Sequence, residues 1–183
     1  MLNIFVGYLF VFFHIKINGF DLLADFVGYA LIYMGLCKLS VNTVNFEKAK
    51  PWTIGMSIVS FISCLGGLFG LDFGNPLFTI LNLITTFISV YIMYLIDTGI
   101  REIEQNTNMD LNSEKLLLIW KVQATLSIGC TILSLIPGNI IVVIAACLTV
   151  AAFIANIVFL VYLYRVKKVL DENIQGGSYG ANL

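Results

Sequence analysis

Long runs of apolar residues make up most of the chain, and short polar segments separate them. Residues 53–96 contain a single charged residue, Asp72, which lies in the turn-forming sequence Asp-Phe-Gly-Asn-Pro. Residues 122–164 contain no charged residue, and Pro137-Gly138-Asn139 divides them into two stretches of roughly 20 residues. An α-helix needs about 20 apolar residues to cross a hydrocarbon core of ~30 Å. Each run therefore predicts two membrane-spanning helices joined by a turn.

The start of the chain predicts a tighter pair of helices. The apolar stretch before Lys38 also carries four ionisable residues: His14, Lys16, Asp21 and Asp25. Two full spans and a turn barely fit there. Counted back from Lys38 along a helix, the Asp25 carboxylate lies on the order of 10 Å below the outer face of the hydrocarbon core. Either the bilayer thins here, or the tip of this hairpin enters protein and water instead of lipid.

The fold class expected from these runs is all-α. We predict a polytopic transmembrane bundle of six helices arranged as three hairpins, which forms a single domain over residues 1–170. Residues 171–183 include Gly176-Gly177-Ser178 and are expected to form a flexible cytoplasmic tail. The predicted spans lie at approximately 2–17, 20–37, 53–71, 77–96, 117–136 and 140–164.

Basic residues predict the orientation, because cytoplasmic loops of membrane proteins carry an excess of Lys and Arg. Lys16 lies at the tip of a hairpin. The other basic residues lie at the opposite ends of the hairpins: Lys38, Lys48, Lys50, Arg101, Lys115, Lys121, Arg165, Lys167 and Lys168. Trp52 and Trp120 lie beside this basic edge, as in an interfacial aromatic belt. We therefore expect a multi-pass protein of the cell membrane with both termini in the cytoplasm. The apolar N-terminus lacks a basic n-region and a cleavage site, so we expect it to be retained.

Composition supports a membrane protein and narrows its partners. Of the 183 residues, 59% are hydrophobic and 11% are charged, and the mean hydropathy is +0.94. Soluble domains carry roughly 25% charged residues. The net charge of -1 provides no excess of cations for a phosphate backbone, so we do not expect nucleic acid as a partner. The four cysteines occur singly and without a neighbouring His, which predicts neither a disulfide framework nor a zinc site.

The most informative polar residues surround the tip of the first hairpin. Ionisable groups at membrane depth are costly and usually face a cavity or a partner. Asp21 and Asp25 are four residues apart and share one helix face. We expect an outward-facing acidic pocket for a cation or a cationic solute, with these candidate ligands: His14, Lys16, Asp21, Asp25, Asp72 and Asn75. In the structural alternative, the two aspartates stabilise the start of the second helix and pair with the neighbouring basic side chains.

Neither an enzymatic reaction nor a cofactor is expected. A serine protease needs a base beside its nucleophile, but His14 is the single histidine and no Gly-x-Ser-x-Gly motif occurs. Asp25 and Asp97 lie at different predicted depths, so they cannot share a proton as in an aspartyl protease. We expect Asp97 to pair with a neighbouring basic group such as Arg101, one helical turn on. We find no motif that identifies a family.

Small residues at helical spacing predict seams where helices pack closely. They occur in the third and sixth predicted spans: Ser60, Ser63, Gly67, Gly70, Ala145, Thr149, Ala152 and Asn156. Asn82 and Asn156 lie inside spans, and we expect each to find an interhelical partner or, as an alternative, to line a solute path. The same seams are suited to a second copy of the chain or to another membrane protein.

Two functions follow as hypotheses. The first is a solute- or cation-binding transporter, or the membrane subunit of one, that uses the outer acidic pocket. The alternative is a non-catalytic scaffold, regulator or immunity-type protein that packs its seams against a membrane partner. The first predicts that Asp21 and Asp25 are essential, whereas the second predicts a closed bundle with a bound partner.

Overall fold

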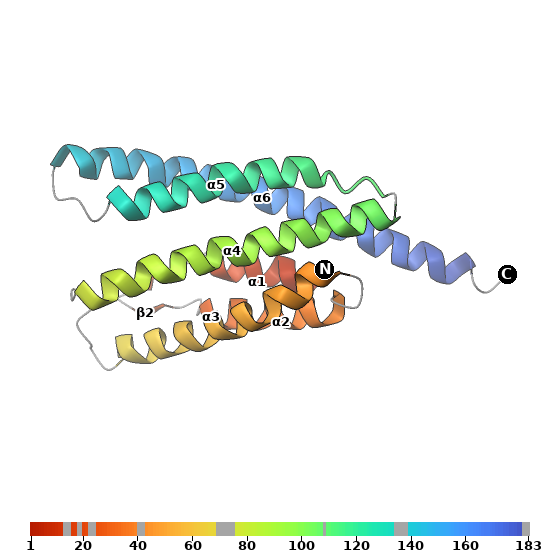
Figure 1. Ribbon diagram of the computed structural model, residues 1–183, viewed down its shortest axis with the longest axis horizontal. Helices are drawn as coiled ribbons and strands as arrows, with labels where there is room; N and C mark the ends of the chain where they lie inside the picture. Colours follow the sequence, from red (N-terminus) through yellow and green to blue (C-terminus); the bar gives the residue numbers. More distant parts are fainter. Residues whose placement is uncertain are drawn as a thin grey trace.

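The residues that the computed structural model describes form six helices and one short strand pair (Figure 1). The elements are α1 (Leu2–Phe12), β1 (Lys16–Ile17), β2 (Phe20–Asp21), α2 (Asp25–Leu39), α3 (Val44–Leu68), α4 (Pro76–Thr107), α5 (Ser113–Leu133) and α6 (Asn139–Gly180). The structure describes the backbone of residues 1–12, 16–17, 20–21, 25–39, 43–68, 76–107, 109–133 and 139–180, and the side chains of 1–12, 25–39, 43–66, 80–107, 109–133 and 143–173. The helical class is confirmed for this part of the chain. The arrangement of six spans as three hairpins stays a prediction.

Three helices are long and apolar enough to cross a membrane. They are Ile80–Thr107 within α4, Ser113–Leu133, and Val143–Asn173 within α6. Most of the apolar window of each is not buried inside the bundle, and large side chains such as Phe87 and Phe153 are exposed. An apolar surface of this extent is suited to lipid tails and unsuited to water. The chain therefore has the features of a membrane protein with a helical bundle.

The first two helices are shorter than the predicted spans 2–17 and 20–37. α1 has 11 residues and α2 has 15. At ~1.5 Å per residue they are about 16 and 22 Å long, less than a hydrocarbon core of ~30 Å. Between them β1 and β2 form a short antiparallel pair with Lys16 opposite Asp21. Lys16 and Asp21, two of the residues that made two full spans hard to fit, therefore lie in this strand pair between two short helices.

Glycines let α1 and α2 pack closely. A Cβ atom on Gly7 would lie 2.5 Å from the carbonyl oxygen of Gly28, and a Cβ on Gly28 would lie 2.8 Å from the carbonyl oxygen of Gly7. Farther along, a Cβ on Gly35 would lie 2.5 Å from Cγ1 of Ile4. Side chains at these positions would push the two backbones apart, so this contact depends on glycine.

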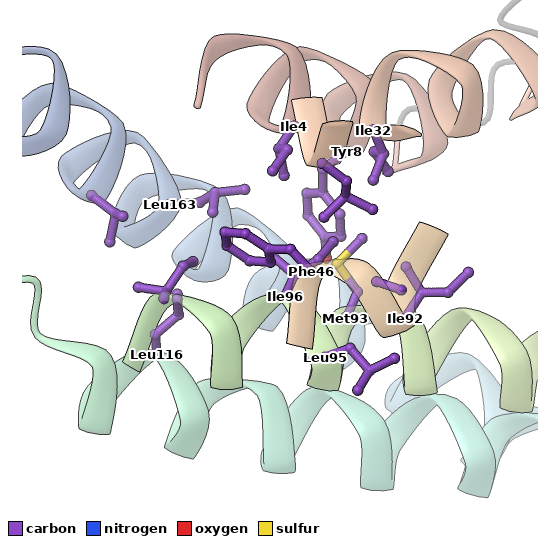
Figure 2. Packing of buried hydrophobic residues seen from close by; sticks show 14 of the residues in the cluster. Ile4, Tyr8, Ile32, Phe46, Ile92, Met93, Leu95, Ile96, Leu116 and Leu163 are labelled. Atoms are coloured by element: carbon purple, nitrogen blue, oxygen red, sulfur yellow. The ribbon is translucent and has the colours of Figure 1, made fainter. Parts of the chain in front are cut away.

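We call the end where α2 joins α3 and α4 joins α5 the polar end, and the end where α3 joins α4 and α5 joins α6 the tip end (Figure 1). The buried core lies toward the polar end of the bundle. Figure 2 shows Tyr8 and Phe46 pointing into this core among residues of α1, α4 and α6. Its largest fully buried apolar residues are Ile4, Ile32, Leu36, Phe46, Ile92, Ile96, Ile100, Leu116, Phe159, Leu163 and Val166.

Ring contacts join α1 to α6, although the two helices are far apart in the sequence. Three aromatic pairs lie along the contact: Phe5 with Tyr164, Tyr8 with Phe159 and Phe12 with Phe153, at centroid distances of 5.6, 4.9 and 5.3 Å. Such pairs contribute about 0.5–1.5 kcal/mol each beyond the area that they bury. α1 is therefore held between α2 and α6.

The tip half of the last two helices differs from the core. None of residues 125–133 of α5 or 143–158 of α6 is buried. α5 and α6 pack on each other there, and the Sγ atom of Cys130 lies 3.9 Å from Oγ1 of Thr149. In the predicted small-residue seam of α6, Thr149 is exposed, so that seam is only partly covered within this chain.

An aromatic row crosses three helices on the outside of the bundle. Trp52 of α3 contacts Tyr91 of α4, Tyr91 stacks on Tyr94, and Tyr94 contacts Trp120 of α5, at centroid distances of 5.7, 6.5 and 5.1 Å. Trp120 also donates a hydrogen bond from Nε1 to the carbonyl oxygen of Val90 at 3.1 Å. The row has the composition of a belt at a membrane surface.

α6 is the longest helix, with 42 residues. It continues past residue 164, the predicted end of the last span, and through Asp171, the predicted start of the tail. Its end extends beyond the other helices (Figure 1). Ion pairs of Lys167 with Asp171 at 3.9 Å and of Lys168 with Glu172 at 3.8 Å lie on this extension. The flexibility of the tail stays a prediction.

Candidate functional site

Most of the predicted outer pocket lies outside the described residues. The structure does not describe His14, Asp72 or Asn75, and it describes only the backbone of Lys16 and Asp21.

The remaining predicted ligand, Asp25, is the first residue of α2. A carboxylate there interacts favourably with the positive end of the helix dipole. The outer pocket therefore stays a prediction.

The described residues contain a different candidate, Asp97, inside the bundle. Its side chain is fully buried on α4, and neither carboxylate oxygen has a hydrogen-bond partner in the part of the chain that the structure describes. Several neighbours of Asp97 on α4 are also buried, among them Met93, Ile96 and Ile100. A buried carboxylate without a partner is costly, so its presence in this core needs an explanation.

The predicted pairing of Asp97 with Arg101 is wrong. Arg101 is exposed and lies at a shallow open pocket of about 370 Å³ beside the connection between α4 and α5. Asp97, in contrast, is 0% exposed, and both of its carboxylate oxygens are buried. Spacing of one turn brings two residues to one face of a helix, but the other helices decide which of them is covered.

A second polar group in the interior joins three helices. Gln123 of α5 donates from Nε2 to the hydroxyl of Tyr8 and to Oδ1 of Asn156 on α6, both at 2.7 Å. The Tyr8 hydroxyl donates to Oδ1 of Asn156 at 2.6 Å, and Asn156 donates from Nδ2 to the carbonyl oxygen of Ala152 at 2.8 Å. We call Tyr8, Gln123 and Asn156 the polar triad.

The polar triad leaves one acceptor unused. Oε1 of Gln123 is buried and has no hydrogen-bond partner among the described residues. The carboxyl of Asp97 lies within electrostatic range of the Tyr8 hydroxyl. Four buried side-chain oxygen atoms of the described residues therefore have no hydrogen-bond partner: two on Asp97, one on Gln123 and the hydroxyl of Thr43.

Sequence reasoning found part of this interior. The expected interhelical partner of Asn156 is confirmed by its bonds to Tyr8 and Gln123, whereas Asn82 is exposed on α4. The same reasoning missed Tyr8 and Gln123. An amide side chain within an otherwise apolar span was a usable signal for Gln123, because such groups need a partner in lipid.

A third polar cluster holds the connection between α4 and α5. Glu104 accepts hydrogen bonds from the backbone N–H groups of Leu111 and Ser113, at 2.7 and 3.2 Å, and from the Ser113 hydroxyl. It lies beyond the apolar part of α4. Partial burial alone would raise the pKa of the Glu104 carboxyl, but these hydrogen bonds lower that pKa below its ordinary value. This carboxylate caps the start of α5 and so has a structural role.

Metal ligands and thiols give no further site in the described residues. No group of three or more His, Cys, Asp or Glu side chains is close enough there to hold a metal ion. The cysteines at 37, 64, 130 and 147 form no disulfide.

No protein-family model, curated protein or solved structure matches the chain significantly. The evidence for a function therefore comes from Asp97 and the polar triad.

Proposed function

We propose that the protein is a small membrane module that binds a cation or a cationic solute, as a transporter or as the membrane subunit of one. The observation that carries this proposal is the buried carboxyl of Asp97, which has no partner among the described residues. Aspartate within an apolar membrane helix is costly, and in membrane proteins it marks pathways of ions, protons and solutes.

A comparison on the same helix supports a binding role over a structural one. Glu104 lies seven residues after Asp97 and accepts three hydrogen bonds that cap the next helix. Asp97 accepts none from the described residues. An ionised carboxylate in this position costs several kcal/mol without a partner, so it destabilises the fold unless a cation binds it.

We also propose that the chain forms six spans in three hairpins, with both termini on the cytoplasmic side of the cell membrane. The basic residues at the polar end support this orientation. In this arrangement Asp21 and Asp25 lie at the outer surface and form the outward access to the bundle. Labelling of single cysteines from either side of intact cells tests the arrangement.

The experiment is thermal unfolding of the protein in lipid nanodiscs with sodium, potassium, magnesium, calcium, ethylammonium and choline chlorides. A ligand that binds the folded state raises the melting temperature. We expect at least one cation to do so for the wild type and for Asp171→Asn, a control that removes an exposed carboxylate. We expect no rise for Asp97→Asn.

A rise that persists in Asp97→Asn would remove Asp97 as the site. If Asp21→Asn/Asp25→Asn abolished the rise instead, the outer pocket would be the binding site.

One observation supports the alternative hypothesis of a scaffold. The tip halves of α5 and α6 carry a broad apolar surface on which no described residue is buried, including Ile144, Val150 and Ile154. Lipid alone covers this surface in a monomer, whereas a second copy would bury it. Native mass spectrometry of the protein released from nanodiscs separates the two: a monomer counts against self-association, and a defined dimer supports it.

A further inference from the structure

We propose that the cation bound by Asp97 is the proton, and that its carboxyl stays neutral in the closed bundle and exchanges that proton with water at the polar end. This inference rests on the proposed function and names the ligand class of the same site. Its basis is the number of oxygen atoms that the interior offers beside Asp97 and the distance from Asp97 to the exposed surface.

Metal cations need more ligands than this interior offers. Calcium takes six to eight oxygen ligands, and magnesium requires an octahedral shell. Alkali ions in selectivity filters are held by rings of carbonyl oxygens. The buried neighbours Met93, Ile96 and Ile100 of Asp97 on α4 are apolar, and the described chain contains no group of three or more acidic, His or Cys side chains that could hold a metal ion. A proton needs a single oxygen atom.

A cationic solute has no access to Asp97 in this conformation. Both carboxylate oxygens are inaccessible to solvent, and the residue as a whole is 0% exposed. A solute with several heavy atoms would require the helices to separate before it could reach the carboxylate. A proton needs no such space, so the closed bundle fits a protonated carboxyl.

No described charged group compensates an ionised Asp97. On α1 and α2 the titratable hydroxyls of Tyr8 and Tyr29 are bonded to Asn156 and to Ser89. On α3 Lys50 pairs with Glu47 at 2.7 Å. None of the remaining charged side chains toward the polar end is a hydrogen-bond partner of Asp97: Lys38, Lys48, Arg101, Glu102, Glu104, Asp110, Glu114, Lys115, Lys121, Arg165, Lys167, Lys168, Asp171 and Glu172. An ionised Asp97 would therefore be an uncompensated buried charge.

Water is close along the helix axis. Arg101 is exposed one turn after Asp97, about 6 Å along α4. When water supplies a proton, the carboxylate becomes a neutral carboxyl, and when the carboxyl releases that proton to water, one negative charge remains in the core. A cationic solute with one positive charge restores neutrality. Release of one proton is thus exchanged for binding of one singly charged solute, which couples proton release to the proposed solute transport.

The test is infrared spectroscopy of the protein reconstituted in lipid, recorded over a pH series. A protonated carboxyl shows a C=O stretch that a carboxylate lacks. We expect this band at neutral pH in the wild type and in Glu104→Gln, and its complete loss in Asp97→Asn. Absence of the band in the wild type at neutral pH, or its persistence in Asp97→Asn, would overturn the inference.

Two further measurements keep the result interpretable. If Asp97→Asn does not fold, aspartate labelled with carbon-13 in the wild type identifies the band by its isotope shift, and Asp97→Glu should retain a protonated carboxyl. Failure of the inference and of the proposed function are distinct. A sodium-dependent rise in melting temperature that Asp97→Asn abolishes, without a protonated band, overturns the proton and retains cation binding. The band without any thermal shift retains the proton and removes solute binding.

Discussion

The first and last helix pairs are both apolar, yet they occupy different environments. α1 and α2 are short, touch through Gly7 and Gly28, and place Ile4 and Ile32 in the core. α5 and α6 are long, and the described residues of their tip halves include none that is buried. A Cβ on Gly129 of α5 would have no atom within 4 Å, in contrast to the 2.5 Å contact at Gly7.

This difference shows that the hydrophobicity of a helix does not by itself determine whether the helix faces lipid or packs against other helices. The apolar side chains of α1 pack against α2 and α6, whereas none of those described in the tip halves of α5 and α6 is buried. Glycine at a crossing and aromatic side chains along a contact distinguish the two cases. The following substitutions test whether the pairs differ in stability as they differ in packing.

The largest effect is expected at the glycine contact. Gly7→Leu places a large side chain where a Cβ alone would lie 2.5 Å from the Gly28 carbonyl oxygen. We expect a loss of about 3 kcal/mol or more in the free energy of unfolding, because the backbones must separate. The measurement is unfolding in mixed micelles with increasing SDS. Gly129→Leu is the control, and an equal loss there would contradict the proposed difference between the pairs.

The next effect is expected where α1 is tied to the last pair. Tyr8→Phe removes the hydroxyl that donates to Asn156 and accepts from Gln123. The ring contact with Phe159 remains, so we expect a loss of about 1–2 kcal/mol from unpaired buried amides. Unfolding of Tyr94→Phe provides a control on an exposed tyrosine. Equal stability of Tyr8→Phe and wild type would show that the polar triad contributes nothing to packing.

A smaller effect is expected at the polar anchor of the last pair. Glu104→Gln weakens the cap on α5, and we expect a loss of about 1 kcal/mol at neutral pH. Because the pKa of Glu104 is lowered by folding, its contribution is present above the ordinary glutamate pKa and is lost as pH falls through the folded value. Unfolding at neutral and acidic pH measures this, and the variant should differ from wild type less in acid.

The smallest effect is expected on the exposed surface of α6. Val150→Ala removes two methyl groups from an exposed side chain, so the change in the free energy of unfolding should stay within about 0.5 kcal/mol. A loss of 1 kcal/mol or more in nanodiscs would show that another protein surface buries this residue. That outcome would favour the scaffold hypothesis.

The two longest helices, α4 and α6, begin within one residue of the predicted positions 77 and 140. α4 begins at Pro76, and proline is favoured in the first turn of a helix. The apolar runs did not show where helices continue into polar sequence: α3 begins at Val44, before the predicted 53, and α6 continues past the predicted 164. A search for membrane spans counts apolar residues, but polar residues also form helix outside a hydrocarbon core.

The interior site was less predictable, because it depends on contacts between distant segments. The spacing of one helical turn predicted that Asp97 pairs with Arg101. In the structure, helices from both ends of the chain pack together and bury Asp97, and Arg101 is not its partner. Tyr8 and Asn156 are 148 positions apart in the sequence and share a hydrogen bond. One sequence contains no signal for such a pairing beyond the presence of a polar side chain in an apolar run.

The unbroken length of α6 has a mechanical consequence. A helix of 42 residues is about 63 Å long, roughly twice the thickness of a hydrocarbon core. A tilt of about 10° around its middle would displace each end by about 5 Å. Tyr8 is bonded to Asn156 near that middle, so a tilt about this contact would move the basic extension outside the hydrocarbon core as far as it moves the tip end.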